Sequence, residues 1–269
     1  MRIIFSRKGF DSAAGGVASP ILPDRTMLPL PIPDRQSPIR YDQICLHGHN
    51  IGRVVQDLTK GRTGANFGAH LDPDLVPDAL SRKSGWQPIF GSAGAAETVL
   101  ERAGVSRGDM FLFFGWYREA VLVNGVYRFA RKARNIHAIW GWMQVERVIS
   151  VEGDAVPSWA EYHPHAAAPE GRRNNTLYIG RAGKFRRFHE GLQLTAPGRG
   201  RSIWSLPGWF HPGQTRPPLG YHADRERWAR DGDRALLRTV SRGQEFVLDA
   251  QYYPEAAHWA ASLMGDRDA

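Results

Sequence analysis

The chain has 269 residues, of which 42% are hydrophobic and 11% aromatic, enough for a sizeable core in one large domain or two small ones. Its single cysteine, Cys45, excludes an intrachain disulfide framework and a cysteine-based zinc cluster. Apolar runs such as MFLFFGW are too short to cross a bilayer, and the N-terminus lacks a signal-peptide pattern, so we expect a cytoplasmic protein without a membrane partner.

The charge balance is basic, because 35 Lys and Arg outnumber 27 Asp and Glu and leave a net charge of +8. Arginine suits bidentate phosphate contacts and stacking on bases. Basic clusters interleaved with aromatic residues recur at 128–134, 171–173, 181–189 and 198–202. Each cluster alone is typical of a solvated face, but together they favour a polyanionic partner, namely a nucleic acid or a nucleotide.

The first third of the chain predicts few regular elements. A short apolar strand is expected at residues 2–5, followed by a loop of small residues. The repeated prolines between 17 and 40 exclude a helix, although the apolar residues among them indicate a segment packed on the protein. Helical spacing then begins at Asn50, the expected N-cap, and ends at Gly61.

The rest of the chain has a clearer pattern. A helix is expected at 94–105, followed by the strand MFLFFGWY and a hairpin at Asn-Gly 124–125. The run 136–153 predicts a long strand in which Gly141 marks a bulge or a close backbone approach. NNTLYIGRA and EFVLDA predict later strands, and 254–265 a final helix. We therefore expect an α+β fold with a twisted, mainly antiparallel sheet and flanking helices.

Two stretches, RAGVSRGDMFLFFGWY and IWGWMQVERVISVEG, resemble the heart of a PUA-like domain, the group that includes the ASCH and EVE families. The shared features are a Gly-Asp turn, a strand of the FLFF kind and a Gly-containing strand that ends in Val-rich sequence. The resemblance implies a small PUA-like β-barrel over about residues 94–180, with a cleft that binds RNA or a modified or flipped base.

A broader resemblance covers most of the chain. FSRKGFDSAAGGVASPI, HLDPDL, GDMFLFFGWYR, HAIWGWMQVERV, HPH and NTLYIG together resemble the third of the nucleotide-modification-associated domain families. We accordingly expect a single domain over residues 1–269, with a Pro-rich N-terminal extension at about 17–40. The resemblance implies a nucleotide or nucleic-acid ligand, and other proteins of a DNA-modification system as partners. It supplies no settled reaction.

The loop after the first strand is a candidate ligand-binding loop. Its consecutive glycines let backbone N–H groups approach an anion closely. We assign Lys8 to phosphate or oxyanion stabilisation and Asp11 to a general base or a sugar contact. A tight turn in which Asp11 caps its own backbone is the alternative. The nucleotide-binding residues expected in this segment are Ser6, Arg7, Ser12, Gly15 and Gly16.

The HLDPDL segment is a candidate metal site. His70, Asp72 and Asp74 occupy alternating positions and would point to the same side of an extended chain. Oxygen and imidazole donors of this kind suit a divalent metal such as Mg, Mn or Fe. The alternative is a capped loop in which one aspartate starts a short helix.

Two histidine pairs, HGH and HPH, each present two imidazoles on one side of an extended chain. Neither has the H-E-x-x-H spacing of a zinc helix. We assign His163 and His165, the HPH pair, as phosphate donors or general acid–base groups, because Arg172 and Arg173 follow shortly after and are expected to bind nucleotide.

A set of tryptophans completes the candidates. Trp140 and Trp142 share one face of their strand if that strand is regular, and Trp116 lies beside Arg118. Buried aromatic packing is the default explanation, but a base-stacking cleft uses the same residue types.

These observations predict a protein of a DNA base-modification system that binds a base or nucleotide in a cleft and acts on it. The reaction stays open between base or nucleotide modification and hydrolysis of a glycosidic or phosphoester bond. One alternative is a non-catalytic reader of modified or flipped bases. Another is a basic subunit that holds nucleic acid for a larger assembly.

Overall fold

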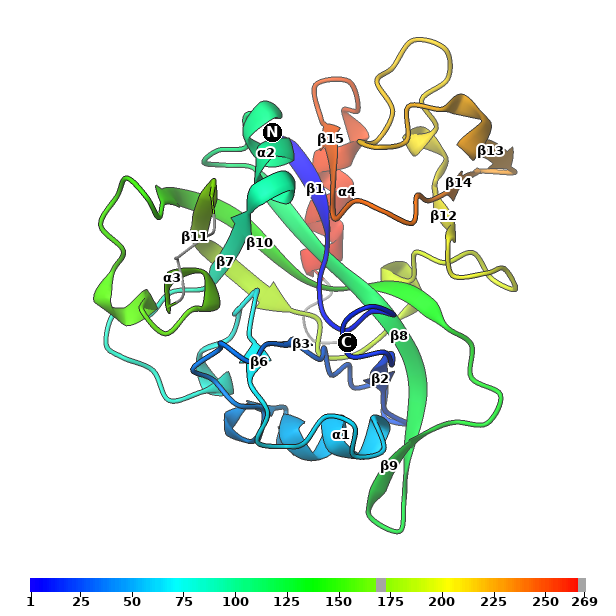
Figure 1. The fold of residues 1–269 in the computed structure, drawn as a ribbon. Helices are drawn as coiled ribbons and strands as arrows, with labels where there is room; N and C mark the ends of the chain where they lie inside the picture. Colours follow the sequence, from blue (N-terminus) through cyan, green and yellow to red (C-terminus); the bar gives the residue numbers. More distant parts are fainter. Residues whose placement is uncertain (168–172, 266–269) are drawn as a thin grey trace.

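The computed structural model describes residues 1–167 and 173–265, and its largest element is a curled, mainly antiparallel sheet of eight strands that forms half of a barrel (Figure 1). The strand order is β15-β1-β8-β10-β11-β7, with β2 and β9 also paired to β8. Strands β1 and β2 run parallel to β8, and the remaining pairs are antiparallel. The strands are β1 (Arg2–Arg7), β2 (Ser19–Ile21), β7 (Ile89–Ala93), β8 (Met110–Val123), β9 (Val126–Phe129), β10 (Ile136–Ser150), β11 (Asn175–Lys184) and β15 (Glu245–Asp249).

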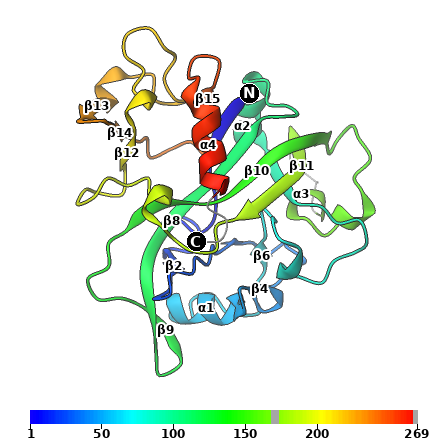
Figure 2. The same ribbon diagram turned by 180° about the vertical axis from the view of Figure 1, so that it is seen from behind.

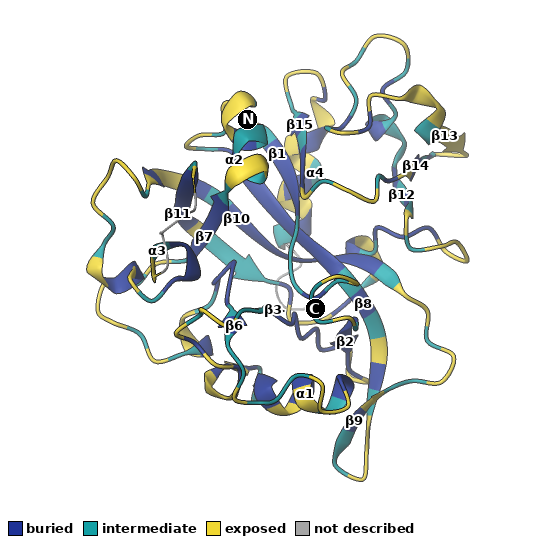
Figure 3. Cartoon of the chain, viewed as in Figure 1, coloured by how far each residue is buried: buried dark blue, intermediate teal, exposed yellow. Residues whose placement is uncertain are grey.

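The central strands are apolar without alternation because both faces of the sheet are covered. On one face, Phe5 of β1 packs against Trp204 and against Trp259 of helix α4 (Glu255–Gly265). On the other face, Phe90, Phe113 and Tyr178 form an aromatic cluster beneath helix α2 (Gly94–Arg102). Figure 3 shows these central strands as the most buried part of the molecule.

A bulge in β10 decides where two tryptophans point. The register between β10 and β8 shifts between Ile139 and Gly141. Trp142 lies opposite Leu112, whereas Trp140 packs on Phe113, the next residue of β8. Neighbouring residues of a strand face opposite ways, so the bulge places Trp140 and Trp142 on opposite faces of the sheet.

Helix α1 (Ile51–Leu58) and the Pro-rich segment form a second layer beside the sheet, seen below it in Figure 1. Asn50 caps α1 as expected, because its side chain accepts a hydrogen bond of 3.1 Å from the Arg53 backbone N–H. Leu28 and Leu30 are fully buried in this second cluster. Its short strands are β3 (Ile32–Pro33), β4 (Cys45–Leu46), β5 (His49–Asn50) and β6 (Ala69–His70).

A three-stranded sheet, β12-β14-β13, covers the face of the main sheet that also carries α4, as Figure 2 shows from behind. It comprises β12 (Ile203–Pro207), β13 (Trp228–Asp231) and β14 (Arg234–Arg238). With α3 (Pro164–Ala167), the described residues contain four α-helices, and none is long and apolar enough to cross a membrane. The expected α+β class and mainly antiparallel sheet are confirmed.

Candidate functional site

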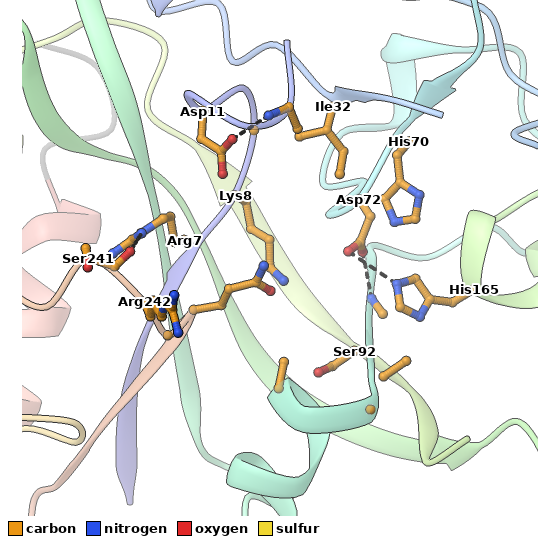
Figure 4. Close-up of a pocket in the computed structure, with 18 of the residues that line it drawn as sticks. Arg7, Lys8, Asp11, Ile32, His70, Asp72, Ser92, His165, Ser241 and Arg242 are labelled. Atoms are coloured by element: carbon orange, nitrogen blue, oxygen red, sulfur yellow. Dashed lines mark hydrogen bonds and ion pairs between the residues drawn. The ribbon is translucent and has the colours of Figure 1, made fainter. Parts of the chain in front are cut away.

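A pocket of about 880 Å³ opens where β1 ends, on the face of the sheet that carries α2. Its wall combines the loop after β1, the end of β6, the β7–α2 junction and residues 241–244. Four cations line it, namely Arg7, Lys8, Arg173 and Arg242. The carboxylates of Asp11 and Asp72 also line it. Figure 4 shows Lys8 between the Asp72 side of the pocket and the Arg7 side.

Lys8 reaches the pocket from the end of the first strand and is paired with the last. Its Nζ lies 3.2 Å from Oε1 of Glu245 and 4.4 Å from the centre of the Phe90 ring. Ser6, which is buried, donates a hydrogen bond of 3.1 Å to the same carboxylate. Burial raises the pKa of Glu245, and the charge of Lys8 opposes that rise.

The loop at 9–16 is held together by its own aspartate. Oδ1 of Asp11 accepts hydrogen bonds from the backbone N–H groups of Ala13 and Ala14, at 2.7 and 2.6 Å. This oxygen therefore caps the turn, as in the alternative given above for Asp11. Gly15 has a φ of +87°, and a Cβ there would overlap the Phe10 ring. Ser12 is exposed and outside the residues that line the pocket, and Gly16 lines a neighbouring groove.

Three predicted residues meet on the opposite wall of the pocket. His70, Asp72 and His165 each offer one metal-ligand atom, and these atoms lie within 4.8 Å of one another. His165 comes from α3, whereas His70 ends β6 and Asp72 lies two residues further along the chain. Oδ1 of Asp72 accepts a hydrogen bond of 2.7 Å from the Gly91 backbone N–H, and Oδ2 lies 3.8 Å from Nε2 of His165. Figure 4 shows the three side chains side by side.

His163 is a buried neighbour of this cluster and contacts Asp72. It is fully buried, and its Nε2 lies 3.3 Å from Oδ1 of Asp72. Burial acts to raise the pKa of Asp72, but the interactions with His163, His165 and Lys8 together outweigh burial and hold that pKa below its usual range. Burial lowers the pKa of His165 to about 3. Near neutral pH the cluster therefore contains an ionised Asp72 beside a neutral His165.

Asp74, the third metal ligand expected from the sequence, has different partners. Both of its carboxylate oxygens accept hydrogen bonds from the Arg82 guanidinium, at 2.6 and 2.7 Å. The hydroxyl of Tyr162 donates a further bond of 2.6 Å. Asp74 is fully buried in this ion pair. It is not one of the three residues, His70, Asp72 and His165, whose ligand atoms converge.

The predicted base-stacking tryptophans lie outside the pocket. Trp140 and Trp142 are buried in the main core. Trp116 lies in a groove of about 390 Å³ across the 9–16 loop, together with Arg118. The Trp116 indole N–H donates a hydrogen bond to Asn135. The guanidinium carbon of Arg201 lies over the Trp116 ring, 4.3 Å from its centre. The HGH pair lies elsewhere, with His49 bonded to the Tyr127 hydroxyl at 2.7 Å.

Several residues of the site were missed by sequence reasoning. Arg242 and Gln244 line the pocket from the segment before β15. In the sequence of this segment, SRGQE, the basic residue Arg242 is the only feature that could have indicated a binding site. Asp34 and Asn175 contact the two cluster histidines, and nothing in their local sequence indicates it. Arg173, predicted to bind nucleotide, lines the pocket, whereas Arg172, predicted with it, lies outside the described residues.

The fold and site together define an α+β protein whose curled sheet carries a basic pocket with a His–Asp–His cluster. The family model described as nucleotide modification associated domain 3 matches residues 2–249, and the chain belongs to this family. The family description associates the protein with nucleotide modification. Neither the curated proteins nor the solved structures gave a match. The PUA-like core and the single-domain organisation stay predictions.

Proposed function

We propose that the pocket binds one nucleotide unit of a nucleic acid and that the protein acts chemically on that unit. The observation that carries this proposal is that four cations and an imidazole–carboxylate cluster line the same pocket. Arg7, Lys8, Arg173 and Arg242 would hold phosphate, and the reacting atom would lie at His70, Asp72 and His165. The volume of about 880 Å³ is in the range of small-molecule sites.

The chemistry of the lining favours an enzyme over a reader of flipped bases. A flipped base is held by stacking between aromatic or apolar side chains. No Phe, Tyr or Trp occurs among the described residues that line the pocket. Charged and small residues dominate instead, which suits recognition of phosphate and sugar and leaves polar groups near the reacting atom.

The surroundings of the pocket favour a polymer over a free nucleotide. The groove on the other side of the 9–16 loop is lined by Lys60, Arg62 and Arg118. Arg118 also lines the next groove, of about 330 Å³, together with the basic residues Lys132, Arg134 and Arg199. A strand whose nucleotide enters the pocket would place neighbouring phosphates along these grooves. We assign Trp116 to a flanking base there, since indole rings stack on bases.

The test is binding and turnover with single- and double-stranded DNA and RNA, plain and base-modified, at about 50 and 200 mM salt. Mass spectrometry of the recovered oligonucleotide reports turnover. We expect a mass change with one class of substrate. Arg242→Ala should weaken its binding about tenfold and reduce the salt slope by about 1, because one phosphate contact is lost. Arg107→Ala, which removes an exposed arginine outside the pocket, is the matched control.

The grooves are tested separately. Arg62→Gln should weaken binding of an oligonucleotide and leave binding of a mononucleotide unchanged, because only the polymer reaches the groove. Modification-dependent binding without any mass change would replace the enzyme with a reader. Equal binding of every polyanion, unchanged by Arg242→Ala, would leave only a basic surface and overturn the proposal.

A further inference from the structure

The hydrogen bonds around His165 fix the orientation of its ring and show which ring nitrogen is left for another ligand. The Asn175 amide Nδ2 donates to the backbone carbonyl of His165, at 2.8 Å, so its Oδ1 faces the ring. That oxygen lies 2.8 Å from Nδ1 of His165 and can only accept a hydrogen bond. Nδ1 of His165 therefore donates to Asn175, and Nε2 is the ring nitrogen left for another ligand.

His70 is oriented in the same way. Its Nδ1 lies 2.8 Å from Oδ2 of Asp34, an acceptor, so Nδ1 donates to Asp34 and Nε2 is the ring nitrogen left for another ligand. An oxygen acceptor on the far nitrogen of a histidine is the usual arrangement around metal-bound imidazoles, where it fixes the tautomer and the ring orientation. Both cluster histidines have this arrangement.

The carboxylate between them lacks a donor on one side. Oδ1 of Asp72 accepts from Gly91, but Oδ2 accepts no hydrogen bond from any described residue. Its neighbour at 3.8 Å is Nε2 of His165, which is too far away for a hydrogen bond. One ligand atom of each of the three residues thus lies within 4.8 Å of the others, an arrangement that a cation between them would stabilise.

We infer that His70, Asp72 and His165 bind a divalent first-row transition-metal ion. Two imidazoles and one carboxylate are typical of Fe²⁺ sites with open coordination positions, and also of catalytic Zn²⁺ sites. All three residues line the pocket, so the remaining positions of the ion face the space where a ligand binds. Mg²⁺, which prefers oxygen ligands and retains its water, fits two imidazoles poorly.

The experiment is a titration of the full chain, freed of any polyhistidine tag and stripped with chelator, with Co²⁺ as the probe. Visible absorption and isothermal calorimetry report binding, and Zn²⁺, Mn²⁺, Fe²⁺ (without oxygen) and Mg²⁺ are compared by competition. The inference does not depend on the proposed function, because the measurement contains no nucleic acid. A failed titration therefore leaves the nucleotide proposal standing, and the reverse also holds.

We expect one equivalent of Co²⁺ to bind, with saturable binding lost in Asp72→Asn and in His165→Ala. His258→Ala, which removes an exposed histidine of α4, should bind like the unaltered protein. Asn175→Ala keeps all three ligands but frees the ring of His165, and should weaken binding about 10- to 100-fold. Absence of saturable binding by the unaltered chain overturns the inference whether or not the variants fold. Binding that Asp72→Asn and His165→Ala leave unchanged in folded protein also overturns it.

Discussion

The ammonium group of Lys8 lies 3.2 Å from the carboxylate of Glu245, and this pair joins the end of the first strand to the last strand. The Glu245 side chain is fully buried, whereas 11% of the Lys8 side chain is exposed. Oε2 of Glu245 has no hydrogen-bond partner among the described residues. Lys8 is therefore the main compensation for a buried negative charge, besides any contact it makes with a ligand.

We expect Lys8→Met to lower the free energy of unfolding at pH 8 by about 3 kcal/mol, because an unpaired carboxylate stays buried. Without Lys8 the pKa of Glu245 rises further, so the protonated acid is favoured in the folded state. The defect should therefore shrink at pH 5 and grow as the pH rises. Urea unfolding at both pH values measures it. The loss of stability in the double variant Lys8→Met, Glu245→Gln, relative to the unaltered protein, should be nearly the same at both pH values. An equal loss of stability in Lys8→Met at pH 5 and pH 8 would contradict this account.

A second buried carboxyl, that of Glu97, is a site where a substitution should stabilise the protein at pH 8 and not destabilise it. Glu97 of α2 is 3% exposed and accepts hydrogen bonds of 2.9 and 3.1 Å from the Tyr178 hydroxyl. Burial raises its pKa to about 7. The stability that this group contributes is complete below its ordinary pKa and is lost as the pH rises through about 7.

Glu97→Gln should therefore match the unaltered protein near pH 4.5 and be more stable at pH 8, by about 1 to 2 kcal/mol. The amide oxygen of Gln still accepts from Tyr178, so the packing is retained. Glu101→Gln removes an exposed carboxyl from the same helix and should show no such pH dependence. Chemical unfolding across this pH range is the measurement, and a variant less stable at pH 8 would show that the charged carboxylate is preferred.

Asp72 and Asp74 are two residues apart and have different roles in this account. Asp74→Asn leaves the Arg82 guanidinium without its carboxylate, so we expect a loss of about 3 kcal/mol of stability. Affinity for Co²⁺ should stay within about threefold, since Asp74 is not among the three converging ligands. Thermal unfolding and the Co²⁺ titration separate the two effects. Loss of Co²⁺ binding in folded Asp74→Asn would restore Asp74 as a ligand.

Local pattern predicted much of the fold. Three features depend only on residues that are neighbours in the sequence, and the structure confirms each of them. They are the strand at the apolar run 110–115, the hairpin at Asn-Gly 124–125 and the capped helix after Asn50. Gly141 also marked a real bulge, but its effect on Trp140 and Trp142 was not evident from the sequence. One extra residue on a strand reverses the direction of the residues that follow, and only the pairing with β8 shows where it occurs.

The site was only partly predictable for a related reason. Metal ligands were expected in HLDPDL and acid–base or phosphate-binding groups in HPH, but the meeting of the two segments depends on β7 and β11, which bring Gly91 and Asn175 together with His165. Asp74 alternates correctly with Asp72, yet Arg82 binds it, eight residues further along the chain. Pairings of this kind are fixed by the packed sheet and not by spacing along the chain.

Gly91 tests how closely the His165 ring must be held. Its backbone N–H donates to Asp72, and a Cβ at this position would lie 2.4 Å from the His165 ring. Ala cannot occupy this position without moving that ring, because close-packed interiors do not absorb such an overlap. Gly91→Ala should raise the Kd for Co²⁺ at least tenfold while the ligands and the Asp72 hydrogen bond remain. Gly200→Ala, where a Cβ meets nothing within 4 Å, is the control. Calorimetry measures both variants, with circular dichroism to verify folding. An unchanged Kd in folded Gly91→Ala would mean that His165 does not bind the ion.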